Sequence, residues 1–283
     1  MVRAAPPPNR LDHWLVTHGH AATREQAQAL IMAGVVTVDG RPADKPGRRV
    51  GREAYVAVRD TPPAYASRGG LKLAHGLAVF AVPVRGRTAV DLGASTGGFT
   101  DCLLRHGAAH VYAVDVGRGQ LAWRLRTDPR VTVLEGQNAR YLEPDHVGGA
   151  RDLVTADLSF ISLRLVWDTV RRLLRPDGDA VVLVKPQFEA GREQVRRGGV
   201  VRDPAAHAAA LRAVLAAAEA SGLAARAASP SPLQGPAGNI EYLVHLRRDG
   251  AAASPLDVAA LVAEAQATFG RTLPAAPDRR SAR

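Results

Sequence analysis

The sequence predicts an α/β protein: a Rossmann-like domain, with a mostly parallel sheet and helices on both faces, preceded by a small α+β domain. Three observations predict this fold. From about residue 70, short apolar segments alternate with helical segments, which is typical of a parallel sheet covered by helices. A glycine-rich turn follows the first of these strand segments. Before residue 60, two helical segments precede strands that flank an Asp39-Gly40 turn.

The chain divides at a proline-containing stretch. We expect residues 1–8 to be disordered, residues 9–60 to form the small domain, and residues 61–66 to be a linker around Pro62 and Pro63. Residues 67–273 form the large domain in this interpretation, and residues 274–283 a disordered tail. A chain of 283 residues is long enough for one full α/β core and one small extra domain.

The small domain has local signals for each of its elements. Thr23 followed by Gln26 predicts the capped start of a second helix, and Gly34 its end. Strands are expected at 35–38 and 54–58. The apolar residues on one face of each helix are Leu11, Trp14 and Leu15 in the first and Ala27, Leu30 and Ile31 in the second.

The large domain is expected to alternate strands and helices. Strands are predicted at 88–91, 110–114, 131–134, 153–156, 180–184, 223–228 and 242–246. Helices are predicted at 70–80, 98–106, 121–126, 161–174 and 204–221. Ligands of such sheets bind at the carboxyl ends of the strands, so we look there for chemistry.

Composition limits the class of protein. The longest apolar stretch, residues 205–220, is interrupted by His207, Arg212 and Glu219, and the amino terminus lacks the apolar core of a signal peptide. We therefore expect a cytoplasmic protein that does not enter membranes. The single cysteine, Cys102, excludes an intrachain disulfide and a cysteine-based metal cluster, and no metal is expected. A net charge of +10 favours a polyanionic partner, although a solvated surface in an arginine-rich protein is the alternative.

The glycine-rich turn is the segment Asp91-Leu-Gly-Ala-Ser-Thr-Gly-Gly-Phe-Thr-Asp101. Its Gly-x-x-x-Gly-Gly spacing is neither the dinucleotide fingerprint nor a Walker loop, which favours an adenosyl ligand without phosphates. S-adenosylmethionine is such a ligand. A purely structural turn and a nicotinamide site are the alternatives. The residues of the turn predicted to bind the ligand are Asp91, Gly93, Ala94, Ser95, Thr96, Gly97, Gly98 and Phe99.

Polar side chains follow the next two strands. Asp115, with Val116 beside it, ends the second strand and is placed to accept hydrogen bonds from ribose hydroxyls. Asn138 follows the third strand, where adenine is expected to lie. An asparagine that only caps a helix is the alternative at this position.

Lysine is rare enough in this chain to be informative. Of 37 basic residues only three are lysines, Lys45, Lys72 and Lys185, so we expect lysine to be kept where arginine cannot replace it. Lys185 ends the fifth strand, and Asp157 ends the fourth and also borders the predicted methyl-donor site. The segment after the fourth strand is Asp-Leu-Ser-Phe, which lacks the Asn/Asp-Pro-Pro-Tyr/Phe pattern typical of amino-group methylation. Cys102 lies in a helix, away from the place of a nucleophile for cytosine methylation. The remaining acceptor is a hydroxyl group.

The small domain resembles an S4 domain, an RNA-binding module. The motifs are Arg10-Leu-Asp-His-Trp-Leu, Thr23-Arg-Glu-Gln-Ala, Ile31-Met-Ala-Gly and Val36-Thr-Val-Asp-Gly. A domain that binds nothing is the alternative. We also expect a loop at residues 191–202 to grip RNA, or else to be a solvated surface loop. The RNA-binding candidates are Arg10, Arg24, Arg41, Lys45, Arg48, Arg49, Arg68, Arg196 and Arg197.

From residue 10 to residue 246 the chain resembles the hemolysin A (TlyA) family, which joins an S4 domain to an FtsJ-like class I methyltransferase domain acting on ribose 2′-hydroxyls. The motifs are Ser67-Arg-Gly-Gly-Leu-Lys72-Leu, the glycine-rich turn, Ala156-Asp157-Leu-Ser-Phe-Ile-Ser, Val184-Lys185-Pro-Gln-Phe-Glu and Gly238-Asn-Ile-Glu241-Tyr. FtsJ-like enzymes carry a Lys-Asp-Lys-Glu tetrad. The resemblance places it on Lys72, Asp157, Lys185 and Glu241.

The resemblance implies an S-adenosylmethionine-dependent methyltransferase that modifies cytidine ribose in small or large subunit ribosomal RNA. Lys185 is the candidate general base; alternatively it stays charged, orients the hydroxyl and stabilises the developing alkoxide. Two other functions are open: a non-catalytic RNA-binding assembly factor, and the lytic activity behind the family name. The sequence does not indicate the modified nucleotide, the subunit or the oligomeric state.

Overall fold

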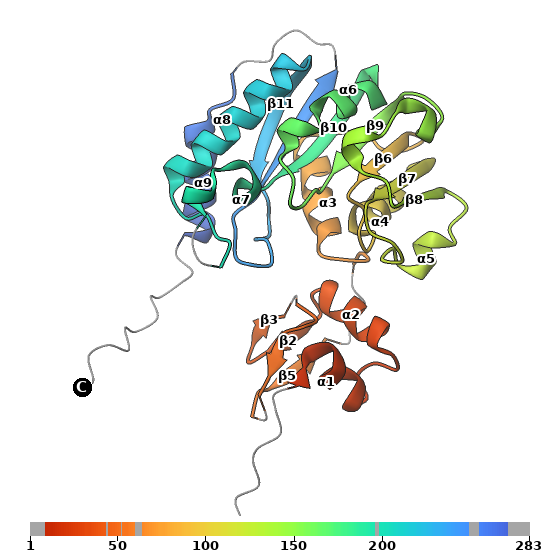
Figure 1. Ribbon diagram of the computed structural model, residues 1–283, viewed down its shortest axis with the longest axis vertical. Helices are drawn as coiled ribbons and strands as arrows, with labels where there is room; N and C mark the ends of the chain where they lie inside the picture. The colour runs from red at the N-terminus through yellow and green to blue at the C-terminus, as the bar shows by residue number, and fades with distance from the viewer. Residues whose placement is uncertain are drawn as a thin grey trace, which may run out of the picture.

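The computed structural model describes residues 9–43, 45–51, 53–59, 64–195, 198–248 and 255–270. Residues 1–8, residues 61–63 of the predicted linker, Arg196, Arg197 and the predicted tail lie outside the described residues. Figure 1 shows two bodies, a small amino-terminal domain and a larger layered domain. The predicted fold class is confirmed.

The small domain packs two helices against short antiparallel strands. They are α1 (Leu11–Thr17), α2 (Arg24–Met32), β2 (Val36–Val38), β3 (Arg41–Pro42) and β5 (Val56–Val58), in the sheet order β3-β2-β5. A second pair joins β1 (Asn9–Arg10) to β4 (Arg49–Val50). Thr23 caps α2 by accepting a hydrogen bond from the Gln26 backbone N–H at 3.2 Å. Asp39 and Gly40 both have positive φ, 54° and 72°, as the tight turn between β2 and β3 requires.

The large domain contains a seven-stranded sheet in the order β11-β12-β10-β9-β6-β7-β8. Its strands are β6 (Thr88–Leu92), β7 (His110–Asp115), β8 (Val131–Glu135), β9 (Arg151–Ala156), β10 (Leu174–Val184), β11 (Leu223–Pro230) and β12 (Tyr242–Arg248). Within this sheet, β12 runs antiparallel to both of its neighbours. The chain order reverses between β6 and β9, which are adjacent, and a ligand-binding crevice is expected at this point.

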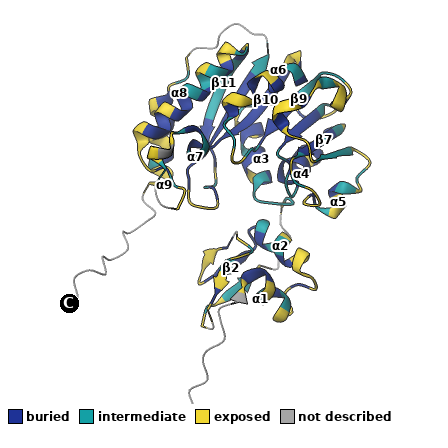
Figure 2. Ribbon diagram, in the orientation of Figure 1, coloured by how far each residue is buried: buried dark blue, intermediate teal, exposed yellow. Residues whose placement is uncertain are grey.

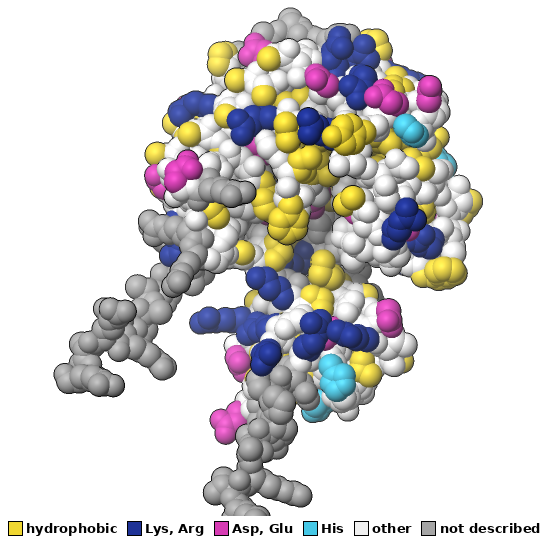
Figure 3. Space-filling view, viewed as in Figure 1, with side chains coloured by type: hydrophobic (Ala, Val, Ile, Leu, Met, Phe, Trp, Pro, Cys, Tyr) yellow, Lys and Arg dark blue, Asp and Glu magenta, His cyan; other side chains and the backbone are white. Residues whose placement is uncertain are grey.

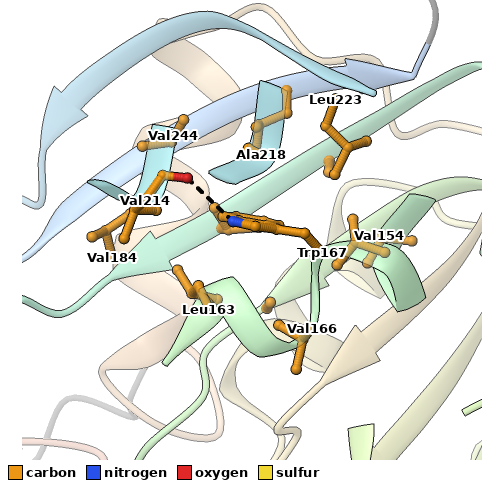
Figure 4. Packing of buried hydrophobic residues seen from close by; sticks show 14 of the residues in the cluster. Val154, Leu163, Val166, Trp167, Val184, Val214, Ala218, Leu223 and Val244 are labelled. Carbon is orange, nitrogen blue, oxygen red and sulfur yellow. Dashed lines mark hydrogen bonds between the residues drawn. The ribbon is translucent and has the colours of Figure 1, made fainter. Parts of the chain in front are cut away.

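Helices cover both faces of the sheet, and alternate strand residues point into two separate cores. On one face lie α3 (Gly69–Val79), α4 (Gly98–Arg105) and α5 (Trp123–Arg126); on the other lie α6 (Trp167–Leu173), α8 (Pro204–Ala220) and α9 (Val258–Phe269). In Figure 2 the central strands of the sheet are largely buried and β11 at its edge is mostly intermediate, whereas the outer faces of α8 and α9 are exposed. Trp167 is buried in the second core, where its indole N–H donates to the Val214 carbonyl at 3.2 Å (Figure 4).

Several elements of the large domain differ from the sequence prediction. The helix expected at 161–174 is a short turn, η3 (Leu163–Leu165), followed by α6, and β10 begins at Leu174 instead of residue 180. A short helix, α7 (Pro186–Glu189), follows β10 directly. The helix α9 was not predicted. Of the helices in the described residues, none has the length and apolar character to cross a membrane.

Candidate active site

The glycine-rich turn connects β6 to α4 at the crevice. Gly93 and Gly97 have φ of 85° and 97°, and Ser95, which is not glycine, has φ of 48°. A Cβ atom at Gly93 would lie 2.6 Å from the Asp157 carbonyl oxygen. The backbone of the turn therefore passes so close to the end of β9 that only glycine fits.

A cleft of about 540 Å³ opens beside this turn and is called here the larger cleft. The Asp115 carboxylate at its wall accepts hydrogen bonds from the backbone N–H groups of Ser95, at 2.8 Å, and Gly117, at 2.7 Å. No Lys or Arg occurs among the described residues that line it. The lining residues are Gly93, Ser95, Val114, Asp115, Val116, Gln120, Gln137, Asn138, Ala139, Asp157, Leu158, Ser159, Phe160 and Ile161.

Two predicted ligand residues, Asn138 and Asp91, have structural roles. The Asn138 side chain accepts a hydrogen bond from the Arg140 backbone N–H at 3.0 Å, so it caps a short helical turn while it also lines the larger cleft. Asp91 is fully buried beneath the turn and does not line the larger cleft. It accepts hydrogen bonds from the hydroxyls of Thr100, at 2.7 Å, and Thr155, at 3.0 Å. Burial raises the pKa of Asp91 to about 7.

A second cleft of about 190 Å³, called here the smaller cleft, adjoins the larger one. The two share Gly93, Ser95, Asp157 and Ser159 in their walls. The smaller cleft also contains the rest of the predicted tetrad. Its lining residues are Met32, Ser67, Arg68, Gly69, Lys72, Gly93, Ala94, Ser95, Thr96, Gly98, Phe99, Asp157, Ser159, Lys185, Pro236 and Glu241.

The tetrad residues meet in the smaller cleft as two ion pairs. Lys185 Nζ lies 2.7 Å from Asp157 Oδ1, and Lys72 Nζ lies 2.5 Å from Glu241 Oε2. Lys72, Lys185 and Glu241 are 7%, 9% and 1% exposed. Because an unpaired buried charge is costly, each carboxylate offsets the burial of one ammonium group. The structure thus brings together one residue of α3, the residues that directly follow β9 and β10, and the residue that directly precedes β12.

The sequence analysis did not single out Ser159 and Phe160. Ser159 Oγ accepts a hydrogen bond from Lys185 Nζ at 2.9 Å, and Phe160 is 92% exposed beside it with φ of 64°. Both lie in the Asp-Leu-Ser-Phe segment, whose position after a strand was the only available signal. Met32 of the small domain also lines the smaller cleft, and its carbonyl accepts from the Arg68 backbone N–H at 3.2 Å.

Some of the basic residues of the small domain lie around the start of α1. Arg10 and Arg24 each donate to the buried carboxylate of Asp12 at 2.9 Å, which holds the pKa of Asp12 far below its ordinary range. The Arg48 carbonyl accepts from the Leu11 N–H at 2.7 Å, so the loop that carries Lys45 and Arg48 lies against the same helix. Figure 3 shows Lys and Arg side chains gathered over this domain. Arg41 and Arg49 are exposed on β3 and β4.

Comparison with known proteins shows the family to which the chain belongs. The family model described as FtsJ-like methyltransferase matches residues 65–248, and the S4 domain model matches residues 9–54. A relative from Mycobacterium tuberculosis, named 16S/23S rRNA (cytidine-2'-O)-methyltransferase TlyA, is 52% identical over 84% of this chain and 89% of its own. The chain belongs to the hemolysin A (TlyA) family of FtsJ-like methyltransferases. It is therefore an enzyme whose methyl donor is S-adenosylmethionine.

Other members of the TlyA family carry different names. Hemolysin A from Brachyspira hyodysenteriae is 36% identical over 83% of this chain and 98% of its own. A solved structure from Streptococcus thermophilus, described as a candidate hemolysin, is 42% identical with a TM-score of 0.75 and covers 94% of this chain and 98% of its own. Similarity over nearly the whole length extends the family likeness to both domains.

Proposed function

We propose that this TlyA-family chain methylates the ribose 2′-hydroxyl of a cytidine in ribosomal RNA. The observation that carries the proposal is the pair of ion pairs in the smaller cleft, directly beside the glycine-rich turn. The name of the Mycobacterium tuberculosis relative supports cytidine and the ribose oxygen as the acceptor. A cytoplasmic location, where ribosomal subunits are found, is part of the proposal.

The larger cleft fits the adenosyl part of S-adenosylmethionine. Its wall combines apolar side chains with the carboxylate of Asp115 and the amides of Gln137 and Asn138, which suits ribose hydroxyls and a neutral base. A phosphate-binding site would need cations or a helix N-terminus with a Walker-type loop. When bound, the cofactor supplies a methyl group already activated by a sulfonium centre.

Lys185 is the candidate for handling the proton of the attacking hydroxyl. Its Nζ is held between Asp157 and Ser159, at the junction of the two clefts, where a ribose hydroxyl must enter to meet the methyl group. As the oxygen gains the methyl group it loses its proton, so a group at this position either accepts the proton or stabilises the developing negative charge. Lysine can perform both roles, whereas arginine cannot be deprotonated in a protein.

Lys72 and Glu241 are proposed to hold the target nucleotide. They form the second ion pair in the smaller cleft, whose wall also includes Arg68 and Met32. Lys72 supplies a point charge for a phosphate, and Glu241 can accept a hydrogen bond from a ribose hydroxyl. The predicted RNA contacts of Arg10, Arg24, Arg41, Lys45, Arg48 and Arg49 lie on the S4 domain, which we propose binds the surrounding RNA.

The proposal is tested by incubating the protein with tritiated S-adenosylmethionine and three substrates: intact small subunits, intact large subunits and naked ribosomal RNA. We expect label in at least one of them and a single mapped position in each labelled RNA. Tight RNA binding with no label in any substrate would favour the non-catalytic assembly factor and contradict the proposal.

The lytic alternative rests on the names of relatives such as Hemolysin A. Leakage of a dye from liposomes separates it cheaply from methyl transfer. We expect no leakage at protein concentrations that support methylation.

A further inference from the structure

Two loops meet at the candidate active site and are joined at their far ends by a buried carboxylate. The first loop, residues 157–162, follows β9 and includes Asp157 and Ser159. The second, residues 185–189, follows β10, begins with Lys185 and forms α7. Glu189 ends α7 and contacts the residues at the end of the first loop. We define the clasp as the contacts of Glu189 with Ser162 and Leu163.

The clasp uses both oxygens of the Glu189 carboxylate. Oε2 accepts a hydrogen bond from the Ser162 hydroxyl at 2.6 Å, and Oε1 accepts one from the Leu163 backbone N–H at 2.8 Å. The Glu189 side chain is only 1% exposed, and Arg164 Nε lies 3.7 Å away. Burying a carboxylate to this extent costs free energy, so we infer that its position serves the structure. It ties the end of the first loop to the end of the second.

The same two loops are joined at their near ends by Lys185. Its Nζ contacts Asp157 at 2.7 Å and Ser159 at 2.9 Å. Between the two ends, the rings of Phe160 and Phe188 lie 5.3 Å apart. The first loop is therefore fixed against the second at three successive places.

The backbone of the first loop needs such support. Phe160 has φ of 64°, in the left-handed region that is unfavourable for a bulky side chain, and its own side chain is 92% exposed. A strained residue persists only where its surroundings determine its conformation. The exposed Phe160 ring packs on little besides Phe188, so the hydrogen bonds on either side of residue 160 must supply most of that support.

We propose that Glu189 is a positioning residue for methyl transfer. It holds residues 159–162 so that Ser159 stays within hydrogen-bonding distance of Lys185 Nζ, and so that Leu158, Phe160 and Ile161 form the wall of the larger cleft. Glu189 lines neither cleft and acts only through the first loop. This inference rests on the proposed function, because it assigns Lys185 to the reacting hydroxyl.

The test compares Glu189→Ala, Glu189→Gln and the wild type, with Glu219→Ala as the control. Glu219 is exposed on α8, away from both loops. Glutamine keeps the length and shape of glutamate, and its side-chain oxygen can still accept a hydrogen bond from the Leu163 N–H. Alanine leaves both donors without their acceptor. We measure kcat and the RNA KM for methyl transfer, the Kd for S-adenosylmethionine, and thermal unfolding.

We expect Glu189→Ala to lower kcat by about 10²-fold, as for a displacement of roughly 1 Å at the reacting groups, with little change in the RNA KM. Its affinity for S-adenosylmethionine should fall as well, and Glu189→Gln should recover most of both losses. Wild-type kcat in a folded Glu189→Ala variant would overturn the proposal. So would a kcat loss in Glu189→Gln as large as in Glu189→Ala.

If Glu189→Ala does not fold, Ser162→Ala carries the test, because it removes one hydrogen bond of the clasp and leaves the carboxylate with the other. We expect a smaller loss of kcat with the RNA KM unchanged; an unaltered kcat would overturn the proposal. Absence of methyl transfer by the wild type would contradict the proposed function instead. The clasp would then still be judged from the Kd for S-adenosylmethionine, which the substitutions must raise.

Discussion

Lys185 and Lys72 are nearly buried, and each lies against one carboxylate. Their scarcity in the sequence made both lysines candidates, together with Lys45; the place of Lys185 after a strand and, for Lys72, the family resemblance then selected them. Their partners were less accessible to prediction. That Lys72 pairs with Glu241, and Lys185 with both Asp157 and Ser159, depends on how loops from distant strands approach each other. Such distances are set by tertiary packing, which leaves no local pattern in the sequence.

Lys185→Arg tests the role of Lys185 in handling the hydroxyl proton. Arginine keeps the charge but cannot accept a proton, and its planar guanidinium does not match a site shaped for one Nζ. We expect methyl transfer to fall by at least 10²-fold, while the Kd for S-adenosylmethionine, measured by calorimetry, changes by less than about threefold. Near-normal turnover would refute the assignment of Lys185 to the hydroxyl proton.

The buried carboxyl of Asp91 makes the stability of the folded chain depend on pH. Its pKa is raised from 3.8 to about 7 in the folded chain, so its contribution to stability is fully present below about pH 4 and is lost as the pH rises through 7. Between pH 5 and pH 8 this loss is on the order of 2–3 kcal/mol. Asn cannot ionise and can still bond the Thr100 and Thr155 hydroxyls.

Urea unfolding of the wild type and Asp91→Asn across this pH range measures the effect. We expect the free energy of unfolding of the wild type to decline relative to that of the variant as the pH rises. The difference between the two curves cancels groups that titrate in both proteins. Parallel curves from pH 5 to pH 8 would show that Asp91 does not titrate in this range.

At the scale of elements, the sequence predicted the seven strands of the large sheet because apolar segments and glycine turns mark them locally. It did not predict α9, although Asp257 caps that helix by accepting from the Ala260 N–H at 2.9 Å. Nor did periodicity reveal that the segment after Ile161 forms η3 before α6 begins. The Glu189 hydrogen bond to the Leu163 N–H fixes the start of η3, and that contact spans 26 residues of chain.

Gly93→Ala tests the close packing of the glycine-rich turn against the end of β9. Its Cβ would lie 2.6 Å from the Asp157 carbonyl oxygen, so the turn and the end of β9 must separate, and the wall shared by the two clefts is disturbed. We expect affinity for S-adenosylmethionine to fall by more than about tenfold, or 1.4 kcal/mol. Gly86→Ala is the matched control, since Gly86 has φ of 74° but nothing within 4 Å of its Cβ.

Both substitutions impose the cost of a left-handed backbone, roughly 1–2 kcal/mol in stability. Only Gly93→Ala should change the binding of S-adenosylmethionine in calorimetry. Equal affinities of the two variants would mean that the close approach at Gly93 is unrelated to the cofactor.

At the scale of the whole molecule, the S4 domain and the methyltransferase domain meet at the smaller cleft. Met32 at the end of α2 lines that cleft, and its carbonyl accepts a hydrogen bond from the Arg68 backbone N–H. Arg68 directly precedes α3, the helix that carries Lys72. The sequence predicted both domains but not this contact, because nothing in either segment indicates which surfaces touch. This contact places the end of α2 in the wall of the cleft that contains the proposed catalytic residues.

The salt dependence of RNA binding tests whether basic residues of the S4 domain contact phosphates. Lys45 and Arg49 are exposed on the S4 domain, and removing a cation that neutralises one phosphate reduces the slope of log K against log salt by roughly 0.7–0.9. We expect the double variant Lys45→Gln/Arg49→Gln to lower the slope by about 1.5. Arg212→Gln on the exposed side of α8 should leave it unchanged. An unchanged slope in the double variant would exclude these residues from the RNA interface.

The methyl acceptor in the proposed reaction is a ribose hydroxyl. The most direct measurement is digestion of RNA methylated by the wild-type protein to nucleosides, followed by mass spectrometry of the labelled product. We expect all of the label in 2′-O-methylcytidine, and none when Lys185→Arg replaces the wild type. Label on a nucleobase would contradict the account of the site built on Lys72, Asp157, Lys185 and Glu241.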